Sequence, residues 1–176
     1  MSIVVFLHGL ESGPDGLKIQ AMRSVALAKG WQVLAPDFRG MTDPEQRTAH
    51  LLSLLPVQQR IRLVGSSLGG YVAAKAVELG QPDLRIEGIF LLCPAFDLAG
   101  YPLARPAQSL RGEAVRIVHG RHDTVVPLSN SMRAAEAWQC SLLVTEDDHP
   151  LHQSIGLISA YLADWLEQPL ARLTEA

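Results

Sequence analysis

The chain has 176 residues, of which 48% are hydrophobic and 19% charged, and we expect one compact domain over residues 1–176 that buries roughly 70% of its unfolded surface. A formal net charge of −3, without a cluster of Lys and Arg, argues against nucleic-acid binding. Two cysteines are too few for a disulfide framework, and no apolar stretch approaches the ~20 residues that span a bilayer, so we expect a cytoplasmic protein without a membrane partner.

Strands and helices are predicted in alternation along the chain. Six short segments run almost continuously apolar, as strands buried on both faces of a parallel sheet do. These predicted strands cover residues 3–7, 32–35, 61–64, 88–92, 115–118 and 142–144. The first, third and last helices are predicted from one-sided apolar faces. Those faces are Leu17, Ala21, Val25 and Ala28; then Leu68, Val72, Ala76 and Leu79; and finally Ile155, Ile158, Leu162 and Trp165.

The second and fourth helices are predicted from the residues that begin them. Asp43 is a candidate cap, Pro44 suits the first helical position, and a glutamine lies three residues after the cap. The apolar residues of this second helix are Leu51, Leu54 and Leu55. For the fourth helix, over residues 129–138, we expect Ser129 as the cap, with Met132 and Ala135 facing inward.

The alternation of strands and helices implies right-handed crossovers and a parallel sheet covered by helices on both faces. Ligands of such sheets bind beyond the carboxyl ends of the strands. The longest irregular stretch, residues 94–112, either lies over that edge or is a plain surface connection.

Ser67 is the candidate nucleophile. It is the middle residue of a Gly-x-Ser-x-Gly motif over residues 65–69, which lies between a predicted strand and a predicted helix. A sharp strand-to-helix turn exposes a serine hydroxyl, and flanking glycines relieve the crowding there. Ser66 precedes it, but only Ser67 holds the middle of the motif. The alternative is a glycine-rich turn with an exposed, inert serine.

A serine nucleophile needs a base, and an imidazole can accept its proton and later donate it to a leaving group. His149 follows the last predicted strand and precedes the last helix, so it should project over the carboxyl edge beside Ser67. His152, which we place in the last helix, is the alternative base. The other four histidines are assigned to a solvated helix, to packing of the first loop, and to structural or cleft-lining positions after the fifth strand: His50, His8, and His119 with His122.

The base in turn needs a carboxylate that fixes its tautomer. Asp123 lies just past the fifth predicted strand, on the edge that His149 can reach. We favour it over Asp147 and Asp148, because adjacent carboxylates beside a histidine can equally form an exposed turn. Asp97, after the fourth predicted strand, is a weaker substitute.

An oxyanion hole requires backbone donors where negative charge develops. The amide of Leu68 follows the nucleophile at the start of a helix, where free N–H groups favour an anion. We assign the second amide to Leu10, in the turn after the first strand, because Gly9 lets the backbone bend back across the site.

The candidate residues follow one another in an order that resembles the α/β-hydrolase superfamily: His8-Gly9, Ser67, Asp123 and His149. Within it, the chain is similar to the small capless esterases over nearly its whole length, in Leu7-His8-Gly9, in residues 65–70, and in the Gly120-x-x-Asp123-x-x-Val126-Pro127 pattern. The resemblance implies Ser-His-Asp catalysis without a metal or cofactor. It also implies a three-layer α/β sandwich of about six parallel strands in the order 2-1-3-4-5-6, without a cap domain.

Two segments depart from the pattern of the family. The tripeptide His8-Gly9-Leu10 lacks the glycine run of many lipases, and two aspartates precede His149 where many relatives carry glycine. Both departures leave the substrate open.

We therefore expect a serine hydrolase that cleaves a small acyl ester or thioester through an acyl-enzyme on Ser67. One alternative is a binding or scaffold protein that keeps the fold and has lost the reaction. Another alternative, which leaves Ser67 without a role, assigns four residues as ligands of a catalytic metal: His119, His122, Asp123 and Asp147.

Overall fold

The structure, a computed structural model, describes residues 2–101 and 110–169. Its strands are β1 (Ser2–Leu7), β2 (Gln32–Leu34), β3 (Arg60–Ser66), β4 (Arg85–Leu92), β5 (Val115–Gly120) and β6 (Ser141–Thr145). Its helices are α1 (Leu17–Ala28), α2 (Pro44–Leu54), α3 (Leu68–Leu79), α4 (Leu128–Trp138) and α5 (Ile155–Glu167), with a short 3₁₀ turn at Gly112–Ala114. Every predicted strand and helix is present, with bounds that differ by a few residues.

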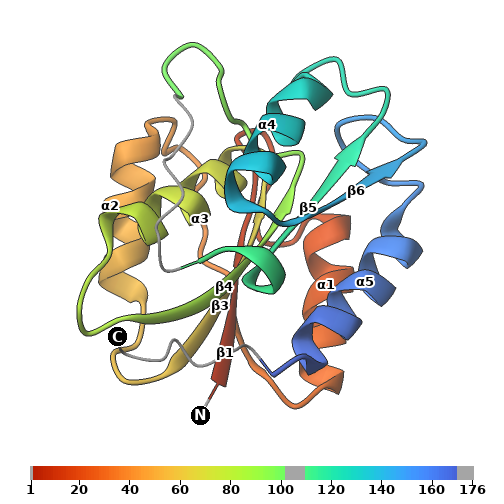
Figure 1. The fold of residues 1–176 in the computed structure, drawn as a ribbon. Coiled ribbons are helices and arrows are strands. Elements are labelled where there is room, and N and C mark those ends of the chain that lie inside the picture. Colours follow the sequence, from red (N-terminus) through yellow and green to blue (C-terminus); the bar gives the residue numbers. More distant parts are fainter. Residues whose placement is uncertain (1, 102–109, 170–176) are drawn as a thin grey trace.

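One sheet joins the six strands in the order β2-β1-β3-β4-β5-β6, and every pair of neighbours is parallel. The predicted fold class and strand order are confirmed. The strands run toward the top of the view in Figure 1, where the connections to α3 and α4 lie. Because the strands are parallel, the segments that follow β1, β3, β5 and β6 meet at this one edge, and the predicted site residues all lie in those segments.

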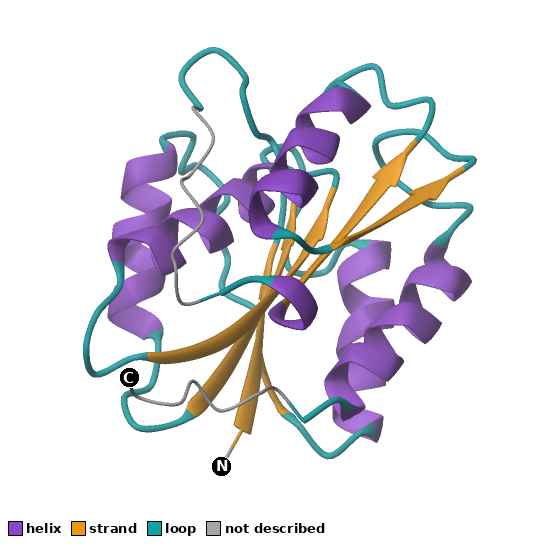
Figure 2. Cartoon of the chain, viewed as in Figure 1, coloured by secondary structure: helices purple, strands orange, loops and turns teal. Residues whose placement is uncertain are grey.

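Helices cover both faces of the sheet (Figure 2). Helices α1 and α5 pack together on one face, whereas α2, α3 and α4 lie on the other. Successive strand side chains alternate between the two hydrophobic clusters: in β1, Val4 and Phe6 face α1 and α5, while Val5 and Leu7 face α2 and α3. The sheet is therefore buried on both sides, which explains why the strands read as continuous apolar segments.

The predicted inward face of α1 is wrong in part, since of its four residues Val25 packs against the core. Leu17 and Ala28 are exposed, and the buried residues are Ile19, Met22 and Ala26. Apolar residues occur on two sides of this helix, and the stripe through Met22 is the one that is fully buried, with Val25 half-buried at its margin. Periodicity alone could not choose between the two stripes.

Helix α4 also differs from the prediction, in its first residue and in part of its inward face. It begins at Leu128 after Pro127, and Ser129 lies inside the helix instead of capping it. Met132 is 57% exposed, whereas Ala135 is buried as predicted, together with Trp138. Pro127 precedes the helix without a side-chain cap, so the helix starts before Ser129.

Residues 102–109, the middle of segment 94–112, lie outside the described residues, so the expectation that this segment covers the site stays a prediction. The described residues contain no domain inserted between the strands. None of the helices in the described ranges is both long enough and apolar enough to cross a membrane.

Candidate active site

Ser67 lies on the sharp turn between β3 and α3. Its backbone has φ 54° and ψ −117°, a left-handed conformation that is unfavourable for a residue with a side chain. A Cβ atom at Gly69 would lie 2.1 Å from the carbonyl oxygen of Leu7, and one at Gly65 would lie 2.3 Å from the carbonyl oxygen of Gly69. Neither position can hold a side chain, and this close packing of α3 on β1 and β3 fixes Ser67 at the carboxyl edge of the sheet.

The imidazole of His149 lies between Ser67 and Asp123. Its Nε2 is 2.9 Å from Oγ of Ser67, and its Nδ1 is 2.7 Å from Oδ2 of Asp123. An ionised carboxylate only accepts hydrogen bonds, so Nδ1 carries the proton and Nε2 accepts from the serine hydroxyl. In this arrangement a neutral imidazole can act as a general base on serine.

The carboxylate of Asp123 is enclosed, with its side chain 0% exposed. Its Oδ1 accepts the amide N–H groups of Val125 and Val126, each at 2.8 Å. Burial alone raises the pKa of Asp123, but hydrogen bonds from His119, from His149 and from the two valine amides outweigh burial and hold the pKa well below its ordinary value. Asp123 is therefore ionised and suited to hold an imidazolium.

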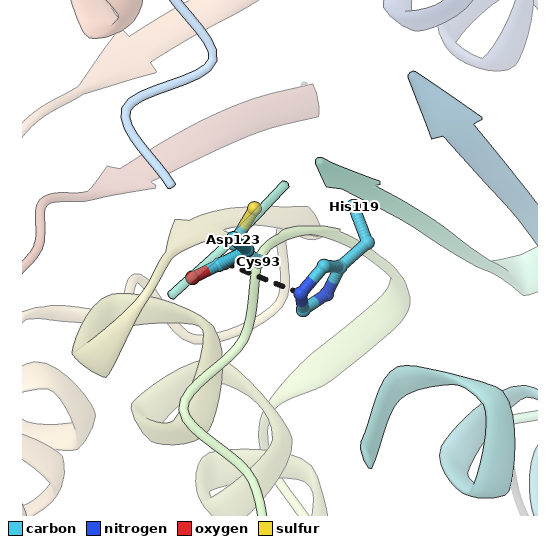
Figure 3. Close-up of side chains that lie close together, drawn as sticks. All are labelled: Cys93, His119 and Asp123. Carbon is cyan, nitrogen blue, oxygen red and sulfur yellow. Dashed lines mark ion pairs between the residues drawn. The ribbon is translucent and has the colours of Figure 1, made fainter. Parts of the chain in front are cut away.

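The side chains of His119 and Cys93 lie beside Asp123 (Figure 3). Nε2 of His119 donates to the carbonyl oxygen of Val126 at 3.0 Å and lies 3.2 Å from Oδ2 of Asp123, while Nδ1 accepts from the hydroxyl of Ser131 at 2.7 Å. Ligand atoms of Cys93, His119 and Asp123 lie within 4.8 Å of one another, a spacing that a metal could use. Both imidazole nitrogens of His119 already have hydrogen-bond partners within the protein. Burial raises the pKa of the Cys93 thiol, which favours the protonated thiol over the thiolate that binds metals.

The loop from β6 to α5 presents His149. Asp147 is 3% exposed, and its Oδ2 accepts both the amide and the hydroxyl of Ser154 at 2.8 Å. Gly120, at the end of β5, gives this loop room, because a Cβ atom there would lie 2.5 Å from the carbonyl oxygens of Asp147 and Asp148. The loop is thus closed on itself and packed against β5, which fixes the backbone that carries His149.

The residues considered as substitutes have other surroundings. His152 is exposed and precedes α5, so its predicted place inside the helix is wrong. Three further candidates have partners of their own: Asp97 with Arg133, His122 with Glu146, and Asp147 with Ser154. Of the four metal ligands considered from the sequence, His119 and Asp123 lie together, whereas His122 and Asp147 are bonded to these other partners.

The turn after β1 lies against the nucleophile. A Cβ atom at Gly9 would lie 3.4 Å from Cβ of Ser67. Gly9, the residue before Leu10, therefore lies beside Ser67, while Leu68 follows Ser67 in the chain. The backbone amides of Leu10 and Leu68 donate to no other described residue and are available to a ligand.

His8 is fully buried and holds this turn, as expected from the sequence. Its Nδ1 donates to the carbonyl oxygen of Gly9 at 2.7 Å, and its Nε2 accepts the amide N–H of Phe38 at 2.8 Å. Burial lowers the pKa of His8, which favours the neutral imidazole that these two bonds require. Both ring nitrogens are engaged with the backbone, so His8 is not available as a base.

Arg47 is not among the predicted site residues, although it reaches the turn after β1 from α2 and is 1% exposed. The spacing of apolar residues in the sequence nevertheless indicates that Arg47 is buried. Residues four apart share one face of a helix, and Arg47 precedes the apolar residues Leu51 and Leu55 by four and eight positions. A charged side chain on that face indicates a buried cation.

The chain matches the model of the alpha/beta hydrolase family over residues 4–174. Among solved structures it is similar to a candidate hydrolase of the alpha/beta superfamily from Xanthomonas campestris pv. campestris, with 30% identity, 95% of this chain and 99% of that chain covered, and a TM-score of 0.83. Est1E from Butyrivibrio proteoclasticus shares the fold at 19% identity, with 94% and 86% of the chains covered and a TM-score of 0.75. Mouse alpha/beta hydrolase domain-containing protein 10 shares it at 18% identity, with 94% and 89% covered and a TM-score of 0.79. No curated protein matches the sequence.

Proposed function

The chain belongs to the alpha/beta hydrolase family, and on this basis we propose that it is a serine hydrolase of the carboxylesterase or thioesterase type, acting on small acyl esters. The observation that carries the proposal is the pair of hydrogen bonds that link Ser67 through His149 to Asp123. The strained backbone of Ser67 adds support, because such strain is unfavourable in a protein that needs only the fold.

In the proposed acylation, Oγ of Ser67 bonds to the acyl carbon while its proton passes to Nε2 of His149. The carbonyl electrons move onto the oxygen, and the amides of Leu10 and Leu68 stabilise that oxyanion. The imidazolium, held by Asp123, then gives its proton to the leaving oxygen or sulfur as the bond from that atom to the acyl carbon breaks.

Deacylation repeats these steps with water. His149 takes a proton from a water molecule whose oxygen bonds to the acyl carbon, and a second oxyanion forms in the same place. Its collapse breaks the bond to Ser67, which regains a proton from His149, and a carboxylic acid leaves. No metal or cofactor enters either step.

The test compares the turnover of p-nitrophenyl butyrate by the wild type, Ser67→Ala and Ser66→Ala. We expect Ser67→Ala to lower kcat by on the order of 10⁴ or more, because the nucleophile is lost. Ser66→Ala is the matched control, since it removes the neighbouring hydroxyl, and it should keep most of the turnover. Equal turnover by Ser67→Ala and the wild type would contradict the proposed function.

A further inference from the structure

Arg47 of α2 donates hydrogen bonds to the carbonyl groups of the turn after β1. Its Nη1 donates to the carbonyl oxygens of His8 and Gly9, at 3.1 and 3.3 Å. Its Nη2 donates to the carbonyl oxygen of Phe38 at 3.3 Å, and its Nε donates to that of Met41 at 2.6 Å. Within the part of the chain that is described, this guanidinium forms no ion pair with a carboxylate. Burying a cation among neutral carbonyl groups is unfavourable for stability, so its presence calls for another reason.

Arg47 contacts the peptide group between Gly9 and Leu10 through its carbonyl oxygen. Its carbonyl oxygen accepts from Arg47 and also from Nδ1 of His8. In a planar trans peptide the N–H points opposite to the carbonyl, and the described residues contain no cis peptide bond. The N–H of Leu10 therefore points away from Arg47. The turn that carries this N–H lies against the nucleophile, because a Cβ atom at Gly9 would be 3.4 Å from Cβ of Ser67.

We propose that Arg47 is a positioning residue for the oxyanion hole, which fixes the direction of the Leu10 N–H through the carbonyl group of Gly9. The inference rests on the proposed function, since the hole acts only where an oxyanion forms. Its effect is on the transition state and not on substrate binding, because the negative charge exists only during reaction. A lysine would keep the charge, but one ammonium cannot reproduce the planar fork that spans these carbonyl groups.

Three variants separate this role from a general contribution to stability: Arg47→Met, Arg47→Lys and Arg62→Met. Arg62 is the matched control, because it is also 1% exposed and also donates to backbone carbonyl oxygens, those of Trp165 and Gln168. It lies in β3, five residues before Ser67, which is roughly 16 Å along an extended strand. Replacing it removes a buried guanidinium of the same kind at a distance from the oxyanion hole.

Two measurements report on the hole. The first is the turnover of p-nitrophenyl butyrate, resolved into kcat and KM. The second is inhibition by 1,1,1-trifluoropentan-2-one, which has the same acyl chain: Oγ of Ser67 adds to its carbonyl carbon, the proton passes to His149, and the carbonyl oxygen becomes a stable oxyanion. Each variant is assayed at a temperature at which circular dichroism shows it to be folded.

We expect both Arg47 variants to lower kcat and raise the Ki of the ketone by about 10-fold to 100-fold, with KM changed by less than about three-fold. Arg62→Met should lower the thermal midpoint without these effects. The inference is wrong if Arg47→Lys and Arg47→Met keep the wild-type kcat and Ki, or if Arg62→Met loses as much activity. If Arg47→Met does not fold, Arg47→Lys alone is compared with the wild type and Arg62→Met. A wild type that neither turns over the ester nor binds the ketone overturns the proposed function, and this inference with it.

Discussion

The side chain of Asp123 is completely buried, and both of its carboxylate oxygens accept hydrogen bonds. These bonds outweigh the effect of burial and lower the pKa of Asp123 from its ordinary value of 3.8. A carboxyl group whose pKa falls on folding stabilises the folded state above its ordinary pKa, and this stabilisation is lost as the pH falls through the lowered value. The residue proposed to orient the base therefore also links stability to pH.

We expect Asp123→Asn to lower the free energy of unfolding most near pH 7, and the difference from the wild type to shrink below a pH of about 4. The difference shrinks because the wild type loses the stabilisation of its ionised carboxylate in acid, whereas the asparagine has none to lose. Urea denaturation of both proteins between pH ~3 and ~7 measures this difference in the free energy of unfolding. A difference that stays the same over this range would show that the pKa of Asp123 is not lowered in the folded protein.

Ser67, Asp123 and His149 could be predicted as neighbours because each directly follows a predictable strand, and parallel strands end at one edge. The structure brings these three side chains together, and their catalytic roles stay predictions until activity is measured. Arg47 and Asp147 could not be assigned in the same way. Each is buried through bonds to loop backbone, and no pattern in the sequence records which loop carbonyl or amide a side chain will meet.

Among the elements, the loop between β6 and α5 depends on a single glycine. Gly120→Ala would place a Cβ atom 2.5 Å from two backbone carbonyl oxygens, those of Asp147 and Asp148. Backbone at that distance must move, and the loop that carries His149 moves with it. We expect this variant to lose both stability and kcat, measured by thermal unfolding and ester turnover.

Gly156→Ala is the control for this substitution. Gly156 lies in the first turn of α5, where an added Cβ meets nothing within 4 Å. Alanine is favoured over glycine in a helix by up to ~1 kcal/mol, so this variant should be at least as stable as the wild type and equally active. Equal behaviour of the two alanine variants would contradict the role given to Gly120.

The elements themselves were largely predictable, and the errors have physical causes. All six strands are short apolar segments, and the central ones are buried on both faces, so all six could be found. Helix faces are harder to predict, because exposed leucines such as Leu17, 61% exposed, add apolar residues on the solvent side of α1. The predicted start of α4 is too late, because the helix follows Pro127 without a side-chain cap.

At the scale of the whole molecule, the sheet holds a hydrophobic core on each face, and Trp165 of α5 is central to one of them. It is fully buried, packs on Phe90 with ring centroids 5.6 Å apart, and has the guanidinium of Arg62 4.8 Å from its own ring centroid. Its indole N–H donates to the carbonyl oxygen of Glu113 at 3.1 Å. One side chain thus joins α5, two strands and the segment before β5.

We expect Trp165→Ala to lower the free energy of unfolding by about 3–5 kcal/mol, because it leaves a large cavity in this core. Leu157→Ala, on the same helix but 53% exposed, should change it by less than ~0.5 kcal/mol. Urea denaturation measures both values. Similar values for the two variants would mean that α5 is not held to the sheet through Trp165.

The most direct test of the central claim, that Ser67 is a nucleophile activated by His149, is the rate at which a fluorophosphonate modifies the protein, with the modified residue identified by mass spectrometry. We expect one phosphonyl group on Ser67 in the wild type and in Ser66→Ala, none in Ser67→Ala, and strongly slowed modification in His149→Ala. Modification of Ser67→Ala at the wild-type rate, or a folded wild type that the reagent does not modify, would contradict the account.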